Sequence, residues 1–219
     1  MENIIIEKEF SKINKTLSKM TMLVIDNIDG AIRSFADYDL ELAQKVIDND
    51  EQINAMELKI EQDCIVFIAK NQPVAGDLRV IQSIYKISTD LERIGDQAKD
   101  ISNLVIQIEN NIAEKLHEKT LKMANEVKEM VSDAIRSFLN RKIDLAFEVV
   151  KKDLLIDKMY YDLKKVITEK LLKNDIIKIE DYISLLFIVK YLEKMGDHAE
   201  NIANWIIYNV EGEFYKKGE

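Results

Sequence analysis

The sequence has few of the residues that interrupt a helix or cross-link a chain. Its 219 residues include one proline, Pro73, six glycines and one cysteine, Cys64. Because glycine and proline are the residues that most often end helices, their scarcity leaves room for few loops and predicts long helices. A single cysteine cannot form an intrachain disulfide. Cys64 lies in the apolar run CIVFIA, where we expect a small core residue.

Positive charge is also scarce: 40 Asp and Glu residues outnumber 31 Lys and Arg residues, for a net charge of −9. Nucleic-acid binding needs a clustered basic surface, so this balance argues against a nucleic-acid partner. The start, MENIIIEKEF, lacks the basic and long apolar segments of a signal peptide. The apolar stretch ISLLFIVKYL contains Lys190 and is about half the length of a membrane span. We therefore expect a cytoplasmic protein with no membrane span.

Apolar residues at helical spacing are abundant. They make up 47% of the chain and recur every three or four residues over six segments, separated by ADYD, NQPVAG, NRK and KNDI. Pro73 suits the first turn of the third helix, where its missing N–H is not needed. The expected helices cover 9–36, 39–70, 74–108, 112–139, 142–173 and 179–209.

The second half of the chain repeats the first. GAIRSF at 30–35 matches DAIRSF at 133–138, and DLERIGDQAK at 90–99 matches YLEKMGDHAE at 191–200. Long helices with short connections are antiparallel neighbours, so each copy should be a three-helix bundle. The sequence therefore predicts an all-α fold of two tandem three-helix bundles, at 1–110 and 111–219.

Each copy places acids one helical turn apart in its third helix, on the side opposite the apolar face. In the first copy these are Glu92, Asp96 and Asp100. In the second copy they are Glu193 and Asp197, and the amide Asn201 stands at the third position. One such pair is usually only a solvated surface. Here, like charges at i and i+4 destabilise the helix by about 0.2–0.5 kcal/mol, and an interior glycine costs about 1 kcal/mol. Both features recur at the same register, with Gly95 and Gly196.

A cation would offset the repulsion between these acids. Carboxylate oxygens without histidine or thiolate suit Mg²⁺, Ca²⁺, Mn²⁺ or iron. Neighbouring helices offer more ligands, Asp50 in the first copy and Asp153 with Asp157 in the second, if packing brings them into place. The glycines would then let the facing helix or the ions come close to the backbone.

These motifs resemble the PhoU family. The resemblance rests on ERIGDQAKDI and EKMGDHAENI, on PVAGDLR at 73–79 and on DNDEQIN and KKDLLID, and it covers essentially the whole chain. It implies two three-helix bundles related by a pseudo-two-fold axis. It also implies multinuclear metal clusters, iron or zinc in known cases, held by Glu/Asp-x-x-x-Asp motifs. In this sequence those motifs are Glu92 with Asp96, extended by Asp100, and Glu193 with Asp197. The expected cofactors are therefore divalent or trivalent ions such as Fe, Zn, Mn or Mg.

The same resemblance implies a regulator and not an enzyme. PhoU proteins repress the phosphate-starvation response by acting with the ATPase subunit of a phosphate ABC transporter and a sensor histidine kinase, and they dampen phosphate uptake. A homodimer is also implied. The sequence contains no nucleophile constellation, Gly-rich phosphate loop or basic pocket for free phosphate.

The chain departs from the family pattern in three places. Asn201 stands where the first copy has Asp100, which predicts weaker metal binding in the second copy. Asn54 stands where the second copy has Asp157. Asp77 and Arg79 of the DLR motif have no counterpart in the second copy.

Three other functions fit parts of the sequence. A di-iron oxidase needs Glu-x-x-His on two helices, but only EKLH at 114–117 fits, and we expect His198 to be a helix-surface residue. A metal-free helical adaptor would leave the acids solvated. An accessory protein of a different phosphate or anion transporter would have the same sequence features.

Overall fold

The structure, a computed structural model, consists of six long helices and short connections between them. It describes residues 2–109, 112–173 and 179–213, and for residues 2–8 it describes the backbone alone. The helices are α1 Glu2–Asp37, α2 Leu40–Asn71, α3 Gly76–Gln107, α4 Glu114–Asn140, α5 Ile143–Lys173 and α6 Ile179–Glu211. The described ranges contain no β-strand. The all-α prediction is therefore confirmed. The predicted boundary between 110 and 111, and most of the KNDI segment, lie outside the described residues.

The ends of the helices follow local chemistry. Asp39 caps α2, because its side chain accepts a hydrogen bond of 2.9 Å from the backbone N–H of Leu42. α2 ends at Asn71 and is followed by the capping residue Gln72, whose φ of 45° places it in the left-handed region. The expectation that Pro73 begins α3 is wrong, since α3 starts at Gly76. Pro73 instead follows the end of α2, a common position because proline cannot continue a helix.

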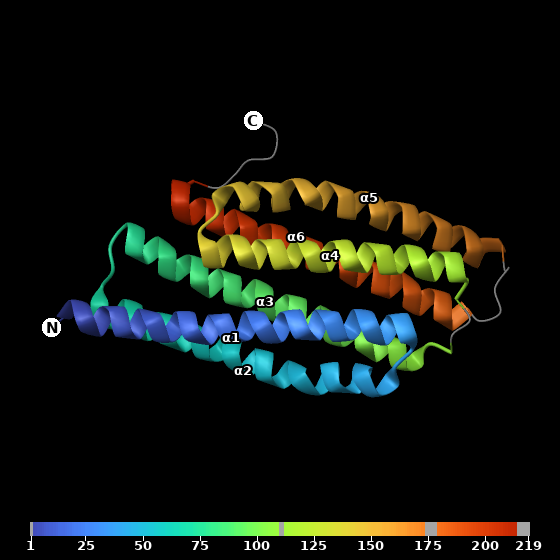
Figure 1. The fold of residues 1–219 in the computed structure, drawn as a ribbon, viewed down its shortest axis with the longest axis horizontal. Helices are drawn as coiled ribbons and strands as arrows, with labels where there is room; N and C mark the ends of the chain where they lie inside the picture. The colour runs from blue at the N-terminus through green and yellow to red at the C-terminus, as the bar shows by residue number, and fades with distance from the viewer. Residues whose placement is uncertain (1, 110–111, 174–178, 214–219) are drawn as a thin grey trace.

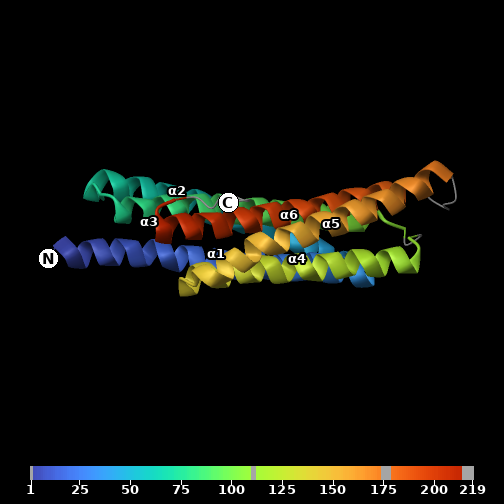
Figure 2. The ribbon, with the colours of Figure 1, turned by 90° about the horizontal axis from the view of Figure 1, so that it is seen from above.

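The two repeats pack through their third helices. α1, α2 and α3 contact one another, as do α4, α5 and α6, while α3 against α6 and α1 against α4 join the two halves. α2 and α5 contact only helices of their own repeat. Figure 1 shows these two helices at opposite edges of the molecule, with the other four between them. In Figure 2, α1 and α4 lie on one side and α2, α3 and α6 on the other.

The core is continuous through both repeats. The apolar face predicted for α3 is buried, with Leu91 and Ile94 at 0% exposure, and the matching Leu192 and Met195 of α6 are each 1% exposed. Burying one such side chain contributes about 1.5–3 kcal/mol, so the packing of these faces holds the helices together. Cys64 is a core residue as expected. Burial, with a smaller effect of Asp63, raises the pKa of its thiol to about 12.

None of the helices in the described ranges has the combination of length and apolarity that crossing a lipid bilayer requires.

Candidate metal centres

The two interior glycines lie where an outer helix meets a third helix. A Cβ atom at Gly95 would lie 2.9 Å from Cδ1 of Ile53 in α2. In the second repeat, a Cβ atom at Gly196 would lie 3.1 Å from Cγ2 of Ile156 in α5. Each glycine therefore allows the facing helix to approach closely, which is one of the two roles expected from the sequence. This approach brings the acids of α2 and α5 next to those of α3 and α6.

The first group of acids, here called the first centre, consists of Asp50 from α2 and Glu92, Asp96 and Asp100 from α3. Burial and then the charge of Asp96 raise the pKa of Glu92, with smaller contributions from Glu57 and Asp50. Burial and then Asp96 likewise raise the pKa of Asp100, and Asp50 contributes. These carboxylates therefore share one electrostatic environment. Glu57, on the same side of α2 as Asp50, was missed by sequence reasoning.

Asp50 is the most buried acid of the first centre, at 2% exposure. Its Oδ2 accepts hydrogen bonds from Lys99 Nζ at 2.7 Å and from Asn54 Nδ2 at 3.2 Å. Its Oδ1 and the Oδ1 of Asn54 are both buried, and neither has a hydrogen-bond partner among the residues that the structure describes. Buried polar oxygens in native proteins nearly always have a donor or a cation. These two oxygens fit a hard metal ion, which binds carboxylate and amide oxygens.

The second group, the second centre, combines α5 and α6. Carboxylate oxygens of Asp153, Asp157 and Asp197 all lie within 4.8 Å of one another, and Asp153 is buried. Glu193, one turn before Asp197, is 9% exposed. Oxygen ligands surround Mg²⁺, Ca²⁺ and similar ions at about 2.0–2.6 Å, so oxygens this close can share one ion. The structure thus brings together the residues predicted from both helices.

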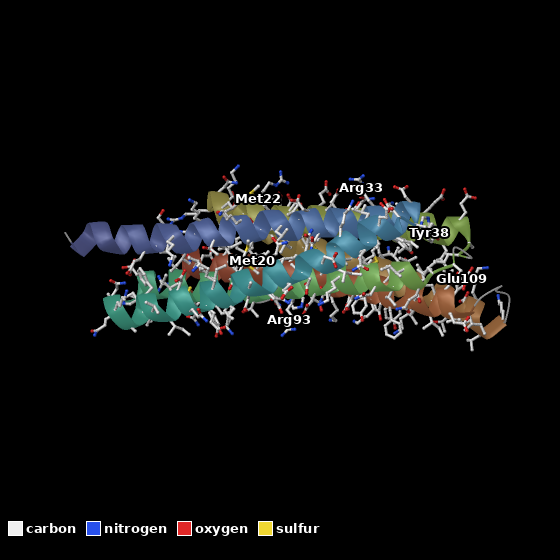
Figure 3. The ribbon with its side chains drawn as sticks, turned by 90° about the horizontal axis from the view of Figure 1, so that it is seen from below. Met20, Met22, Arg33, Tyr38, Arg93 and Glu109 are labelled. Atoms are coloured by element: carbon white, nitrogen blue, oxygen red, sulfur yellow. The ribbon has the colours of Figure 1, made fainter. Side chains whose placement is uncertain are left out.

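Basic side chains flank both centres, a feature that the sequence reasoning missed. Arg93 lies 3.5 Å from both Glu92 and Asp96, and Figure 3 shows it on the side of the molecule away from α1. In the second centre, Lys190 Nζ lies 2.8 Å from Glu193. The further contacts are those of Lys99 with Asp50, and of Lys194 with Glu193 and Asp197.

The ion pairs of the first centre neutralise only part of its negative charge. Among the described residues, four of the predicted carboxylates there, those of Asp50, Glu92, Asp96 and Asp100, are accompanied by the two cations Arg93 and Lys99. The difference of two charges matches the charge of one divalent ion.

Two side chains of α6 point toward α3. Asn201 Nδ2 donates a hydrogen bond of 3.3 Å to Asp90 Oδ1, so its amide nitrogen contacts the other repeat. His198 Nδ1 lies 2.8 Å from the same Asp90 oxygen, and its side chain is 22% exposed. The histidine expected on the helix surface is thus partly covered by the α3–α6 contact. Asp77 lies in the first turn of α3, and Arg79 two residues further on, away from both centres.

Comparison with known proteins agrees with this duplicated arrangement. Residues 17–105 and 120–206 each match the family model described as the PhoU domain. The chain belongs to the PhoU family. It is 38% identical over 209 residues to a phosphate-specific transport system accessory protein PhoU homolog of Aquifex aeolicus, covering 95% of this chain and 94% of that protein.

Two solved PhoU structures have the same fold. The crystal structure of PhoU from Pseudomonas aeruginosa matches with a TM-score of 0.91 and 33% identity, over 94% of this chain and 99% of that one. The phosphate transport system regulatory protein PhoU from Streptococcus pneumoniae matches with a TM-score of 0.88 and 29% identity, over 96% and 99%. The predicted PhoU-like architecture of two three-helix bundles is confirmed.

Proposed function

We propose that this PhoU-family chain is a metal-binding, non-enzymatic regulator of a phosphate transport system, acting in the cytoplasm. The names of its relatives support the phosphate role, since the Aquifex aeolicus protein is a phosphate-specific transport system accessory protein. In this role the chain would repress phosphate uptake and the phosphate-starvation response. Its partners would be the ATPase subunit of a phosphate ABC transporter and a sensor histidine kinase.

The observation that supports metal binding most directly is the buried carboxylate of Asp50. An oxygen of a 2% exposed acid without a hydrogen-bond donor is costly to the fold, by about 1–3 kcal/mol. A cation bound by Asp50 and Asp96 would remove that cost. In the second centre, Asp153 and Asp197 would act in the same way.

The donor set favours Fe, Mn, Mg or Zn ions bound by oxygen. Such an ion would supply positive charge that joins the outer helix of a repeat to its third helix. Asp50 would hold it from α2, and Glu92, Asp96 and Asp100 from α3. Asp153 and Asp157 of α5 would hold a second ion with Glu193 and Asp197 of α6.

Exposed apolar side chains give the regulator surfaces for its partners. On α5 these include Leu154 at 64% and Tyr161 at 72% exposure, and on α6 Phe187 at 49%. Exposed apolar side chains that adjoin one another form docking surfaces, and we infer that these side chains of α5 and α6 do so. The same surfaces would serve a homodimer.

Metal content tests the first part of the proposal. Protein purified without chelator should contain metal by elemental analysis, and Glu92→Gln with Asp96→Asn should remove the share held by the first centre. The exposed pair Glu114 and Glu118 in α4 has the same spacing, so changing both to Gln is the matched control and should leave metal content unchanged. Metal-free wild type that is not stabilised by added Mn²⁺, Fe²⁺ or Zn²⁺ would leave the metal-free adaptor as the function.

A phosphate-regulated reporter tests the second part. Deleting the gene should switch on the starvation response in phosphate-rich medium, and restoring the wild-type chain should silence it. Co-purification with the ATPase subunit of a phosphate ABC transporter would identify the partner. A reporter that does not respond, together with capture of a different permease, would favour the accessory protein of another transporter.

A further inference from the structure

A cavity of about 250 Å³ lies where α4 and α6 finish, and residues of both repeats line it. Figure 2 places these two helix ends and the first half of α1 at the same end of the molecule, here called the open end. Apolar side chains of α1, α3, α4 and α6 form most of the wall. The polar lining residues are Asn14, Ser18, Ser83, Arg141 and Asn209.

The charge of this cavity is positive, although the chain has a net charge of −9. Among the described residues, no carboxylate lines it and Arg141 is its one charged residue. The described part of the chain supplies no ion-pair partner for Arg141, and no hydrogen bond to the half-buried side chains of Asn14, Ser18 and Asn209. A mostly apolar wall with a few polar groups that lack protein partners is typical of a small-ligand site.

The opposite end of the molecule, where Figure 3 shows Tyr38, has an aromatic ring at the matching place. The imidazole of His117 in α4 is stacked on Tyr38, with ring centroids 5.3 Å apart and an angle of 14° between the planes. Its centroid is 4.6 Å from that of Phe35, and its Nε2 lies 3.0 Å from the carbonyl oxygen of Phe35. This end, here called the filled end, is therefore occupied by a ring of the chain itself.

The backbone has the same conformation at both ends. Tyr38 follows α1 with a φ of 54°, and Arg141, 103 residues later, follows α4 with a φ of 51°. In each case the next residue donates from its backbone N–H to the carbonyl oxygen five residues earlier, at 3.1 Å and 2.9 Å. Phe35 and Phe138 correspond in the same way. The frame around the His117 ring is thus present twice.

Two side chains differ between the ends. Asn14 stands where the filled end has His117, so the ring is missing there, and Phe138 is only half-buried. Arg141 stands where the filled end has Tyr38. A guanidinium group is planar and stacks on aromatic rings, and it also carries a positive charge. The open end therefore keeps two planar groups that can contact a ring but lacks the ring.

We propose that the open end binds a small planar aromatic anion, with its ring in the place that His117 fills at the other end and its anionic group on Arg141. The ring stacks on Phe138 and on the guanidinium group. The amide of Asn209 hydrogen-bonds to a polar atom of the ligand. This site is separate from the proposed metal binding, because it includes none of the acids of the two centres.

The size of the cavity limits the ligand. A cavity of about 150 Å³ can hold benzene, so the volume at the open end suits one ring or two fused rings. An adjoining hollow also borders Arg141, but Asp77 lines it. A longer anion that reached this hollow would meet a negative charge.

Three compounds separate the contributions of ring and charge, each titrated calorimetrically into the full wild-type chain. 2-Naphthalenesulfonate has both, 2-naphthol has the ring without the charge, and cyclohexanesulfonate has the charge without the planar ring. The first should bind at least about tenfold more tightly than either of the others. NMR contacts between its ring protons and those of Phe10 and Phe138 should locate it. Equal affinity for all three, or contacts elsewhere, would overturn the proposal.

Arg141→Gln tests the role of the guanidinium group. Glutamine suits this backbone, since Gln72 has a φ of 45° in the same chain. The affinity for 2-naphthalenesulfonate should fall by about 10–100-fold, because a charged hydrogen bond is lost. Arg136→Gln, which removes an exposed arginine of α4 that pairs with Asp133, is the matched control and should leave affinity unchanged. Equal losses in the two variants would contradict a specific site.

Two further chains test the occupant. Asn14→His places a ring of the chain in the cavity and should abolish binding of 2-naphthalenesulfonate, whereas Asn14→Ser leaves the space open and should retain it. A chain that ends at Glu213 lacks Phe214 and Tyr215 and should bind as wild type does. Tighter binding by this shortened chain would mean that the protein's own end occupies the cavity. That result, or normal binding by Asn14→His, would overturn the proposal.

Discussion

Gly95 of α3 packs against Ile53 of α2 so closely that a methyl group at Gly95 would lie 2.9 Å from one Ile53 carbon and 3.2 Å from another. Ile53 is completely buried, so it cannot move away freely. Alanine would gain about 1 kcal/mol of helix propensity, but overpacking a core typically costs about 1–3 kcal/mol. We expect Gly95→Ala to destabilise the protein by about 1 kcal/mol, measured by urea unfolding.

Two further variants test this explanation. Ile53→Val deletes the closest carbon, Cδ1, and should reduce the penalty of Gly95→Ala when the two changes are combined. At Gly76, a new Cβ would have no atom of the described part of the chain within 4 Å, so Gly76→Ala should be neutral or slightly stabilising. A loss of stability at Gly76 equal to that at Gly95 would contradict a steric cause.

The acids of the first centre predict a pH-dependent stability in the metal-free protein. Burial, and then Asp96, raise the pKa of Glu92 above its ordinary value of 4.5. The folded state thus binds this proton more tightly than the unfolded chain does, and stability from this group is lost as pH rises through its folded pKa. We expect Glu92→Gln to be more stable than wild type at about pH 7 in the presence of chelator, with the difference disappearing below pH 4.5.

Urea unfolding of both proteins over a range of pH values measures this effect. Glu118→Gln changes an exposed acid of α4, and its difference from wild type should be small at every pH. A Glu92→Gln variant that is less stable than wild type near pH 7 would show that Glu92 is held in its ionised form by Arg93 more strongly than burial opposes it.

Lys99 and a metal ion should compete for Asp50. The Lys99 ammonium lies 2.7 Å from Asp50 Oδ2, and its side chain is 35% exposed. Lys99→Met removes this partner and should destabilise the metal-free protein by about 1–2 kcal/mol, less than for a fully buried pair. The same change should strengthen Mn²⁺ binding at the first centre, because one competing cation is gone. Weaker binding of Mn²⁺ in this variant would mean that Lys99 supports the centre.

Asp39 should contribute measurably to stability from a position remote from both centres. Its side chain caps α2 by accepting from Leu42 N, a role that the sequence analysis did not assign to this residue of the ADYD break. Asp39→Ala should lower the free energy of unfolding by about 1 kcal/mol. Asp39→Asn keeps an acceptor oxygen and should retain most of that stability. Thermal unfolding of the two variants under the same conditions distinguishes them.

The helices and the pairing of acids were predictable because both follow from periodicity. A period of 3.6 residues gave the core face of α3 and the opposite position of Glu92 and Asp96. The internal repeat could be detected by comparing the sequences of the two halves of the chain. That Asp50 faces α3 could not be deduced, because it depends on how two helices pack, and the close approach at Gly95 and Ile53 decides that packing.

Two sets of contacts made by α6 could not be deduced from the sequence. Asn201 donates to Asp90 of α3, and this contact depends on how α3 and α6 pack. Side chains three residues apart on a helix are neighbours, so Lys190 pairs with Glu193 and Lys194 with Asp197, although neither lysine is on the line of the acids. Aligning the sequences of the two copies predicts neither the contact of Asn201 nor these ion pairs.

The pseudo-two-fold contact of α3 with α6 has a consequence for the sequence of the chain. A single repeat could form the same contact with an identical copy of itself, but symmetry would then force equivalent positions on the two sides to carry the same residue. Two repeats within one chain are free of that constraint. Asp90 and Asn201, joined by a hydrogen bond of 3.3 Å, show the result, because Tyr191 and Asp100 stand at the matching positions of the opposite repeats.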